Sequence, residues 1–130
     1  MNETKPIETS EPKVDFSKID GELVPGIVQD AKSGQVLMVG FLNPTSYQKT
    51  LESGFVTFWS RTRRKLWMKG ETSGNRLRVL SAATDCDNDT LLFKVEVEGD
   101  GLVCHEGTIT CFTKPIAVPA GPISVAGEAR

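Results

Sequence analysis

Residues 22–44 read ELVPGIVQDAKSGQVLMVGFLNP, and the order of apolar and polar residues in this stretch decides the fold. Residues 27–31 and 35–42 are two apolar runs rich in Val, Ile and Leu, and the polar sequence KSGQ supplies the turn between them. Runs of this composition around a glycine-containing turn are typical of paired β-strands. The stretch therefore predicts two strands joined by a tight turn.

A helix is expected immediately after the second strand. Asn43 is a residue type that caps helices, and Pro44 fits the first helical position, where its missing N–H costs nothing. The helix then runs over residues 45–53 and ends at Gly54, because glycine readily adopts the left-handed conformation that terminates helices.

The sequence beyond the helix consists of short apolar runs and turns. Residues 91–99 alternate clearly, with the charged side chains on one face of a strand and Phe and Val on the other. The pattern predicts a compact, antiparallel-rich α+β or barrel-like domain. The further strand candidates are residues 55–59 and 65–70, which flank RTRR as a hairpin, residues 75–84, and a final hairpin within residues 102–112 around Glu106 and Gly107.

Length, charge and composition limit the classes of protein. The 130 residues suit one domain, and the net charge of -2 gives no general attraction to nucleic acid or anionic membranes. The N-terminal residues contain no apolar or basic leader, and no run of about 18 apolar residues exists. We expect a cytoplasmic protein with no nucleic-acid or membrane partner, whose cysteines are thiols or metal ligands.

Both ends of the chain differ in composition from the middle. Residues 1–15 are polar and lack periodicity, so a disordered N-terminal arm is expected. Residues 113–130 are rich in Pro, Gly and Ala and predict an extended tail, in which residues 116–118 are a candidate for one short strand. The folded domain is therefore expected at residues 16–112.

The acidic sequence TDCDND, residues 84–89, nearly matches the calcium-loop pattern of an EF-hand. The match fails at Thr90, which stands where the loop needs glycine, and the flanking residues lack helical spacing. The period of two is more informative, because an extended segment places all three carboxylates on one face and Cys86 on the other. Grouped carboxylates favour Mg²⁺ or a similar cation, and a solvated acidic turn is the alternative. The candidate ligands are Asp85, Asp87 and Asp89.

The three cysteines, Cys86, Cys104 and Cys111, do not have the spacing of a standard zinc finger. A hairpin around HEGTIT would nevertheless bring Cys104 and Cys111 together, and Cys86 can join from a neighbouring segment. Three thiolates suit Zn²⁺ and leave a fourth position for water, which zinc activates as a nucleophile. His105 is the candidate acid, base or proton shuttle beside the metal. Buried thiols and a surface histidine are the alternative.

A basic stretch, WSRTRRKLWMKGETSGN at residues 59–75, places Arg and Lys between two tryptophans and ends in a glycine loop. Arginine grips phosphate oxygens, and backbone amides and hydroxyls in a turn can form a phosphate nest. Stacking on single-stranded nucleic acid and an exposed charged hairpin tip are alternatives. The near-neutral chain favours a small phosphorylated ligand over a polymer. The candidate phosphate-binding residues are Arg61, Arg63, Lys69, Thr72 and Ser73.

Taken together, these stretches resemble the phosphoribosyl-AMP cyclohydrolase family of histidine biosynthesis over about residues 26–112. The resemblance is carried, in order, by IVQDA, VLMVGFLN, WSRTR, LWMKGETSGN, DCDND and CHEGTITCF. The chain departs from the pattern at Asn75, where many members carry histidine, and at Glu106, where a small hydroxyl residue is frequent. A fused phosphoribosyl-ATP pyrophosphohydrolase domain would need about 100 more residues, so a monofunctional chain is expected.

The resemblance implies a small β-rich pseudobarrel that works as an intertwined homodimer. It implies zinc at Cys86, Cys104 and Cys111, with ligands from both subunits, and Mg²⁺ at the three aspartates. The implied reaction is zinc-dependent hydrolytic opening of the adenine ring at the N1–C6 bond of N1-(5-phosphoribosyl)-AMP. The product is the formimino-aminoimidazole-carboxamide ribotide. In this scheme the magnesium site orients the substrate and His105 moves protons as the ring opens.

Two other classes of protein make different predictions. A binding module with structural zinc and a nucleotide- or RNA-binding hairpin would unfold on zinc removal and tolerate Asp87→Ala. A calcium-binding module would show a calcium response that Glu96→Gln abolishes. A homologue that binds substrate without turning it over is a third alternative.

Overall fold

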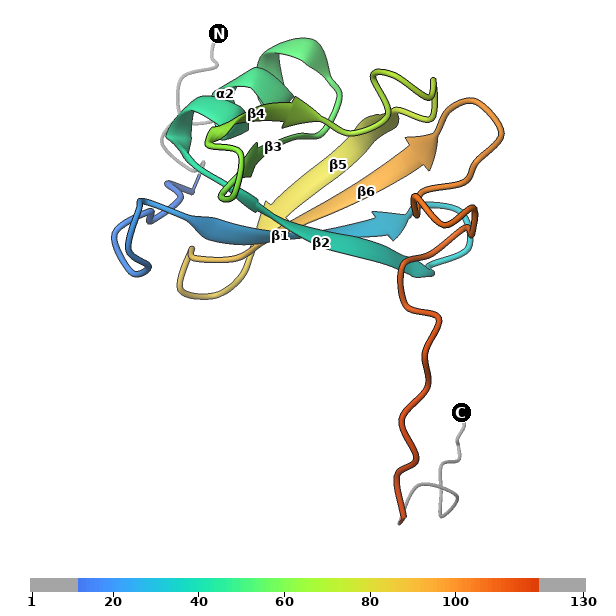
Figure 1. The fold of residues 1–130 in the computed structure, drawn as a ribbon. Helices are drawn as coiled ribbons and strands as arrows, with labels where there is room; N and C mark the ends of the chain where they lie inside the picture. The colour runs from blue at the N-terminus through green and yellow to red at the C-terminus, as the bar shows by residue number, and fades with distance from the viewer. Residues whose placement is uncertain (1–11, 120–130) are drawn as a thin grey trace, which may run out of the picture.

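The computed structural model describes residues 12–119, which form six strands and one helix. Four strands form one sheet in the order β2-β1-β6-β5, and β3 and β4 form a separate hairpin (Figure 1). The β-rich α+β class predicted from the sequence is confirmed. The elements in chain order are β1 (Val24–Asp30), β2 (Val36–Leu42), α2 (Pro44–Ser53), β3 (Thr57–Ser60), β4 (Lys65–Met68), β5 (Leu77–Thr84) and β6 (Leu91–Val97).

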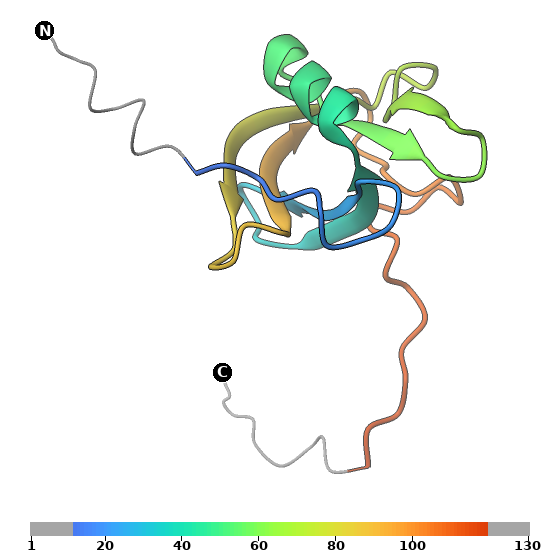
Figure 2. The same ribbon diagram turned by 90° about the vertical axis from the view of Figure 1, so that its left-hand side faces the viewer.

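The four-stranded sheet curves around one apolar interior, and α2 lies across its open side (Figure 2). Val14 and Phe16, which precede the first strand, pack against this interior and are partly buried. The core is therefore shared by the sheet, the hairpin and the segment before β1. Its buried members are Val24, Val28, Leu37, Met38, Leu42, Val56, Phe58, Leu77, Leu91, Phe93, Val95 and Val103.

The sheet is mixed, because β1 has an antiparallel and a parallel neighbour. It pairs antiparallel with β2, as the sequence predicts, and Gly26 lies opposite Gly40 in that register. It pairs parallel with β6, from Gly26 opposite Leu91 to Asp30 opposite Val95. The helix, the hairpin and β5 together form the long connection that a parallel pair requires. The antiparallel pair β5–β6 completes the sheet.

The helix α2 begins and ends where the sequence predicts. The Asn43 side chain accepts a hydrogen bond from the Ser46 amide at 2.8 Å, and the Asn43 amide donates to the Ser46 hydroxyl at 3.0 Å. These reciprocal bonds form a capping box. At the other end Gly54 adopts φ 82° and its amide donates to the Thr50 carbonyl at 2.9 Å. Local sequence is sufficient to set both ends of this helix.

Gly40 allows the β3–β4 hairpin to pack directly on β2. A Cβ atom at Gly40 would lie 2.5 Å from Cδ1 of Phe58, which is fully buried. Thr50 joins α2 to β3, because its hydroxyl accepts a hydrogen bond from the Thr57 amide at 2.9 Å. The hairpin that carries the basic residues is thus fixed to both the sheet and the helix.

The segment after β6 differs from the sequence prediction. No strand forms between residues 98 and 119, so the final hairpin and the short strand at 116–118 were wrong. A compact turn forms instead, in which the Gly107 amide donates to the Cys104 carbonyl at 2.9 Å and the Cys104 amide to the Thr108 carbonyl at 3.0 Å. A turn with side-chain and backbone partners of this kind does not need a strand ladder.

Two other sequence predictions concern the chain ends and membranes. Residues 1–11 of the expected arm and residues 120–130 of the expected tail lie outside the described residues. Residues 113–119 form no regular secondary structure, and Ile116 is 86% exposed there. Within residues 12–119, no helix has the length and apolar character needed to cross a membrane.

Candidate functional site

The three aspartates of the acidic run converge in the turn between β5 and β6. One carboxylate oxygen from each of Asp85, Asp87 and Asp89 lies within 4.8 Å of the others. The segment is not extended, so the expected alternation of faces was wrong. The Asn88 amide donates to the Asp85 carbonyl at 3.1 Å, and Asn88 adopts φ 64°. The turn itself, rather than the period of a strand, brings the carboxylates together.

Two aspartates of this acidic turn have pKa values shifted in opposite directions. Desolvation acts to raise the pKa of Asp85, but hydrogen bonds from Asp89 and from the Thr90 amide hold this pKa below its ordinary value. The Lys18 ammonium favours the charged form of Asp89, yet desolvation and the neighbours Asp87 and Asp85 together raise its pKa. The Lys18 ammonium therefore does not cancel the effect of desolvation and of the neighbouring carboxylates on the pKa of Asp89. Oxygen donors grouped in this way fit a hard divalent cation.

Lys18 is a functional candidate that sequence reasoning missed. Its Nζ lies 3.3 Å from Asp87 Oδ2 and 3.2 Å from Asp89 Oδ2. The contact with Asp89 raises the pKa of Lys18. The hydrogen-bonded partners are separated by 69 and 71 residues in the chain, and no local pattern predicts contacts at such a distance.

Cys104 and Cys111 form a pair at the turn after β6. With His105 and Glu106 they line a hollow of about 340 Å³. The Glu106 amide and the Thr108 side chain lower the pKa of Cys104. Partial desolvation and the adjacent Cys104 thiol raise the pKa of Cys111. Two neighbouring thiols are a soft donor set, which a soft cation would bind as thiolates.

The third cysteine does not join this pair within one chain. Cys86 lies in the acidic turn before β6, whereas Cys104 and Cys111 follow the opposite end of that strand (Figure 1). A strand of seven residues separates the two ends by about 20 Å. The Cys111 amide is fixed to the Leu37 carbonyl at 2.8 Å, at the start of β2. A single chain therefore supplies two of the three expected zinc ligands at one point.

His105 lies beside the thiol pair, and its side chain is 88% exposed. Its Nε2 is 4.0 Å from Oε2 of Glu106, which is also exposed. Because both side chains border the same hollow, the histidine is free to face a ligand bound next to Cys104. The structure thus places the candidate proton-transfer residue at the candidate zinc site.

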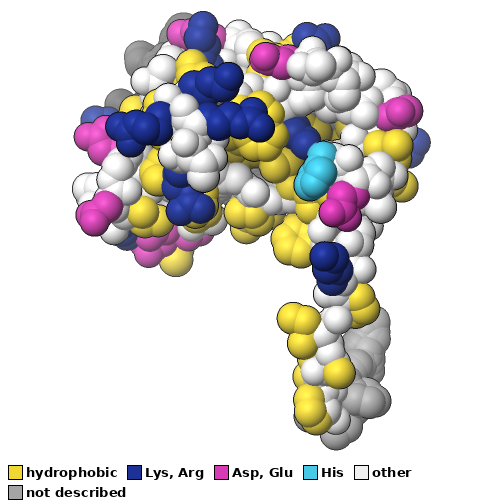
Figure 3. All heavy atoms as spheres, in the orientation of Figure 1, with side chains coloured by type: hydrophobic (Ala, Val, Ile, Leu, Met, Phe, Trp, Pro, Cys, Tyr) yellow, Lys and Arg dark blue, Asp and Glu magenta, His cyan; other side chains and the backbone are white. Residues whose placement is uncertain are grey.

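The basic hairpin and the glycine loop border a second hollow of about 370 Å³. Lys and Arg side chains gather over this part of the surface (Figure 3). Four of the five predicted phosphate-binding residues line it, namely Arg63, Lys69, Thr72 and Ser73. Arg61 is not in its lining, and its guanidinium instead lies 4.3 Å from the centre of the Phe41 ring.

A comparison with protein families identifies this combination of elements. Residues 38–113 match the family model described as phosphoribosyl-AMP cyclohydrolase. The chain belongs to the phosphoribosyl-AMP cyclohydrolase family. The matched range begins within β2 and contains the acidic turn, the basic hairpin and the thiol pair. The resemblance seen in the sequence is therefore confirmed.

Several curated relatives are similar to this cyclohydrolase chain. A phosphoribosyl-AMP cyclohydrolase from Solibacter usitatus is 58% identical over 99 residues, which cover 76% of this chain and 77% of the relative. The histidine biosynthesis bifunctional protein HisIE of Vibrio cholerae is 52% identical, over 86% of this chain and 52% of its own length. The bifunctional protein of Escherichia coli strain K12 is 59% identical, over 77% of this chain and 48% of its own length. The chain thus matches about half the length of the bifunctional relatives.

Asn75 has a structural task in this member of the cyclohydrolase family. Its side chain is nearly buried, donates to the Leu102 carbonyl at 2.9 Å and accepts from the Asp100 amide at 3.1 Å. It therefore ties the glycine loop to the segment that leads to Cys104. Gly99 leaves room for this side chain, because a Cβ at Gly99 would lie 2.0 Å from Oδ1 of Asn75.

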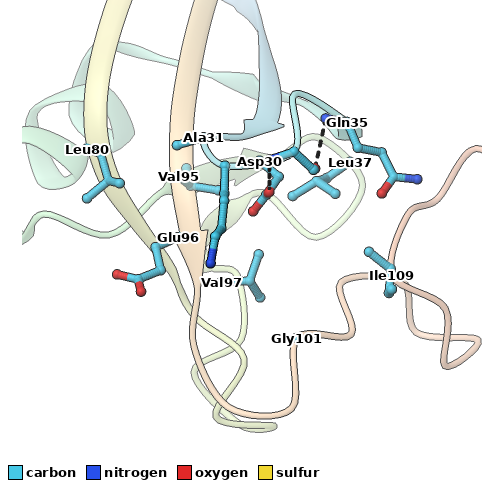
Figure 4. A pocket seen from close by; sticks show the side chains of 12 residues that line it. Asp30, Ala31, Gln35, Leu37, Leu80, Val95, Glu96, Val97, Gly101 and Ile109 are labelled. Atoms are coloured by element: carbon cyan, nitrogen blue, oxygen red, sulfur yellow. Dashed lines mark hydrogen bonds between the residues drawn. The ribbon is translucent and has the colours of Figure 1, made fainter.

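A third hollow in the described residues was not predicted from the sequence. It measures about 660 Å³ and lies between the β1–β2 turn, residues of β5 and β6, and the loop that carries Ile109 (Figure 4). Leu80 and Ile109, each 55% exposed, lie in its lining with Leu37 and Val97. Its lining contains one basic residue, Lys32, and no thiol or histidine.

Proposed function

We propose that this chain catalyses the hydrolytic opening of the adenine ring of N1-(5-phosphoribosyl)-AMP in histidine biosynthesis. The observation that carries the proposal is the pairing of Cys104 and Cys111 beside His105 in a chain of this family. In the reaction, water adds to C6, the N1–C6 bond breaks, and a proton is delivered to N1. The product is the formimino-aminoimidazole-carboxamide ribotide.

The thiol pair fits zinc, because two adjacent sulfur ligands are a soft donor set. Bound zinc would supply a Lewis acid that lowers the pKa of a water molecule and makes it a better nucleophile. We assign to His105 the transfer of a proton from the attacking water to the leaving nitrogen, since its exposed ring borders the same hollow.

The phosphate groups of the substrate are assigned to the hollow along β4 and the glycine loop. Arg63 and Lys69 supply positive charge there, and Thr72 and Ser73 supply hydroxyl donors. Arg61, which stacks on Phe41, is the weakest of the five candidates in this structure. The polar lining fits a ribose phosphate better than a purine ring.

The acidic turn is assigned to Mg²⁺, because its three carboxylates converge and are poorly neutralised. When bound, the cation would orient the substrate through its phosphate oxygens. Asp85 is held in the charged form by backbone amides, which prepares one ligand before the cation arrives.

We further propose that the enzyme works as a homodimer in which the site is completed by the partner. The support is the separation of Cys86 from the thiol pair by the length of β6. If Cys86 of a second copy joins Cys104 and Cys111, the acidic turn that contains Cys86 arrives at the same place. Both metal sites would then lie at one boundary between subunits. The free thiols also favour a reducing compartment, so we propose the cytoplasm.

The test is an absorbance assay with N1-(5-phosphoribosyl)-AMP on the purified protein, the chelated protein, and the chelated protein after adding back each ion. We expect chelation to abolish turnover and both Zn²⁺ and Mg²⁺ together to restore it. A folded, zinc-loaded protein without turnover would overturn the proposal. In that case nucleotide binding to the hairpin would be measured next, because the binding-module interpretation predicts it.

A further inference from the structure

The acidic turn is contacted by a cation from its own chain. The Lys18 ammonium donates to the Asp87 carbonyl at 3.3 Å, to Asp87 Oδ2 at 3.3 Å and to Asp89 Oδ2 at 3.2 Å. These contacts use two of the three carboxylates that converge in the turn. The ammonium therefore occupies positions on the oxygens that a divalent cation would need.

The segment before β1 delivers Lys18 to this place by several fixed contacts. The Asp15 amide donates to the Asn88 carbonyl at 2.7 Å, so the segment is bound to the acidic turn itself. Phe16 packs against the core with its ring 6.0 Å from that of Tyr47. The Ser17 amide and hydroxyl both donate to Asp15 Oδ1, which shapes the chain just before Lys18.

Lys18 can leave its carboxylates while the segment stays in place. Its side chain is 42% exposed, and a flexible four-carbon chain carries the ammonium, so the ammonium can move into solvent. The backbone bond from Asp15 to Asn88 does not depend on that movement. A divalent cation among carboxylate oxygens that lie within 4.8 Å of one another would lie next to the ammonium and repel it.

We propose that Lys18 is a displaceable counter-ion that holds the acidic turn together without metal and competes with the divalent cation for Asp87 and Asp89. The competition sets the cation concentration at which the turn becomes loaded. The inference rests on the proposed Mg²⁺ site and adds a residue from outside the matched range, 38–113, that tunes it. Lys18 is a positioning residue and takes no part in the chemical step.

The experiment measures binding of Mn²⁺, as a paramagnetic substitute for Mg²⁺, to the full-length zinc-loaded protein by the electron paramagnetic resonance signal of free Mn²⁺. Lys18→Met removes the ammonium and keeps the length of the side chain. Lys13→Met is the matched control, because Lys13 is an exposed lysine of the same segment. Asp89→Asn removes one carboxylate and reports whether Mn²⁺ binds at the acidic turn.

Lys18→Met is expected to tighten Mn²⁺ binding by about three- to tenfold, the range for removing an exposed positive charge next to a divalent site. Lys13→Met should change it less than about twofold, because Lys18, and not Lys13, makes the ion pairs with Asp87 and Asp89. In the metal-free protein, Lys18→Met should also speed hydrogen exchange of the amides in residues 85–90, and added Mg²⁺ should remove that difference.

Two results would overturn the inference in distinguishable ways. If Asp89→Asn weakens Mn²⁺ binding but Lys18→Met leaves it unchanged or weakens it, competition by Lys18 is excluded and the metal assignment stands. If Mn²⁺ binding is absent or insensitive to Asp89→Asn, the proposed metal site itself fails, and the inference fails with it.

Discussion

The thiols Cys104 and Cys111 show how one residue can alter the chemistry of its neighbour. The turn around Gly107 directs the Glu106 amide and the Thr108 side chain toward Cys104, and these groups favour its thiolate. The same thiol disfavours the thiolate of Cys111, which is also partly desolvated. The Cys104 thiol therefore loses its proton more readily than the Cys111 thiol.

This difference predicts selective alkylation in the metal-free protein. In a Cys86→Ser background, iodoacetamide near neutral pH should modify Cys104 before Cys111, because a lower pKa means a larger thiolate fraction. The pH profile of the Cys104 reaction should lie below that of a model thiol, and that of Cys111 above it. Peptide mass spectrometry over time measures both rates. Faster modification of Cys111 would contradict the assignment.

The loops at one end of the sheet are the elements that shape the candidate site. Asn75 holds the glycine loop against residues 100 and 102. The same side chain therefore stabilises the loops beside the hollow at the basic hairpin and beside the hollow at the thiol pair. Neither loop has a strand ladder to stabilise it. The order of this end of the molecule therefore depends on side-chain hydrogen bonds.

Asn75→Ala is expected to destabilise the fold by about 1–3 kcal/mol, because it leaves the Leu102 carbonyl and the Asp100 amide without their partner. Urea unfolding of the zinc-loaded protein measures the change. Gln48→Ala is the control, since Gln48 is an exposed amide on α2, and it should change stability by no more than about 0.5 kcal/mol. Equal effects of the two substitutions would contradict the structural task of Asn75.

Over the whole molecule, the decisive feature is the distance between the acidic turn and the thiol pair. The parallel pairing of β1 and β6 fixes which end of the sheet each occupies. A site that needs both must be shared between two copies of the chain. Activity of mixed dimers tests this arrangement directly.

Cys86→Ser and Cys104→Ser should each be inactive alone but recover about a quarter of wild-type turnover when co-assembled. About half of the dimers are then mixed, and each mixed dimer keeps one intact site. Cys86→Ser co-assembled with Asp87→Asn is the control and should recover no turnover. Both changes fall in the acidic turn, so each of the two sites of a mixed dimer contains one altered turn. The co-assembled protein is assayed without separating mixed dimers from the two parental dimers. No recovery in the first mixture would show that the zinc ligands come from one subunit.

The sequence by itself determined the features that depend on neighbours along the chain. The capping box of Asn43 and Ser46, the stop at Gly54 and the β1–β2 pair follow from local preferences that tertiary contacts reinforce. The sequence likewise supplied the candidate metal ligands and four residues that line the hollow at the basic hairpin. For the acidic run the sequence favours an extended segment, whereas the structure has a turn there. The period of two does not distinguish the two conformations.

Only the tertiary structure decided which of these residues meet. The parallel β1–β6 pairing depends on how apolar faces are buried together, and it sets the end of β6 beside the β1–β2 turn, where the Cys111 amide meets the Leu37 carbonyl. The contact of Lys18 with Asp89 and the support that Asn75 gives to Leu102 join segments 71 and 27 residues apart. Such contacts leave no periodic pattern in the sequence, since they arise only after the core has brought the segments together.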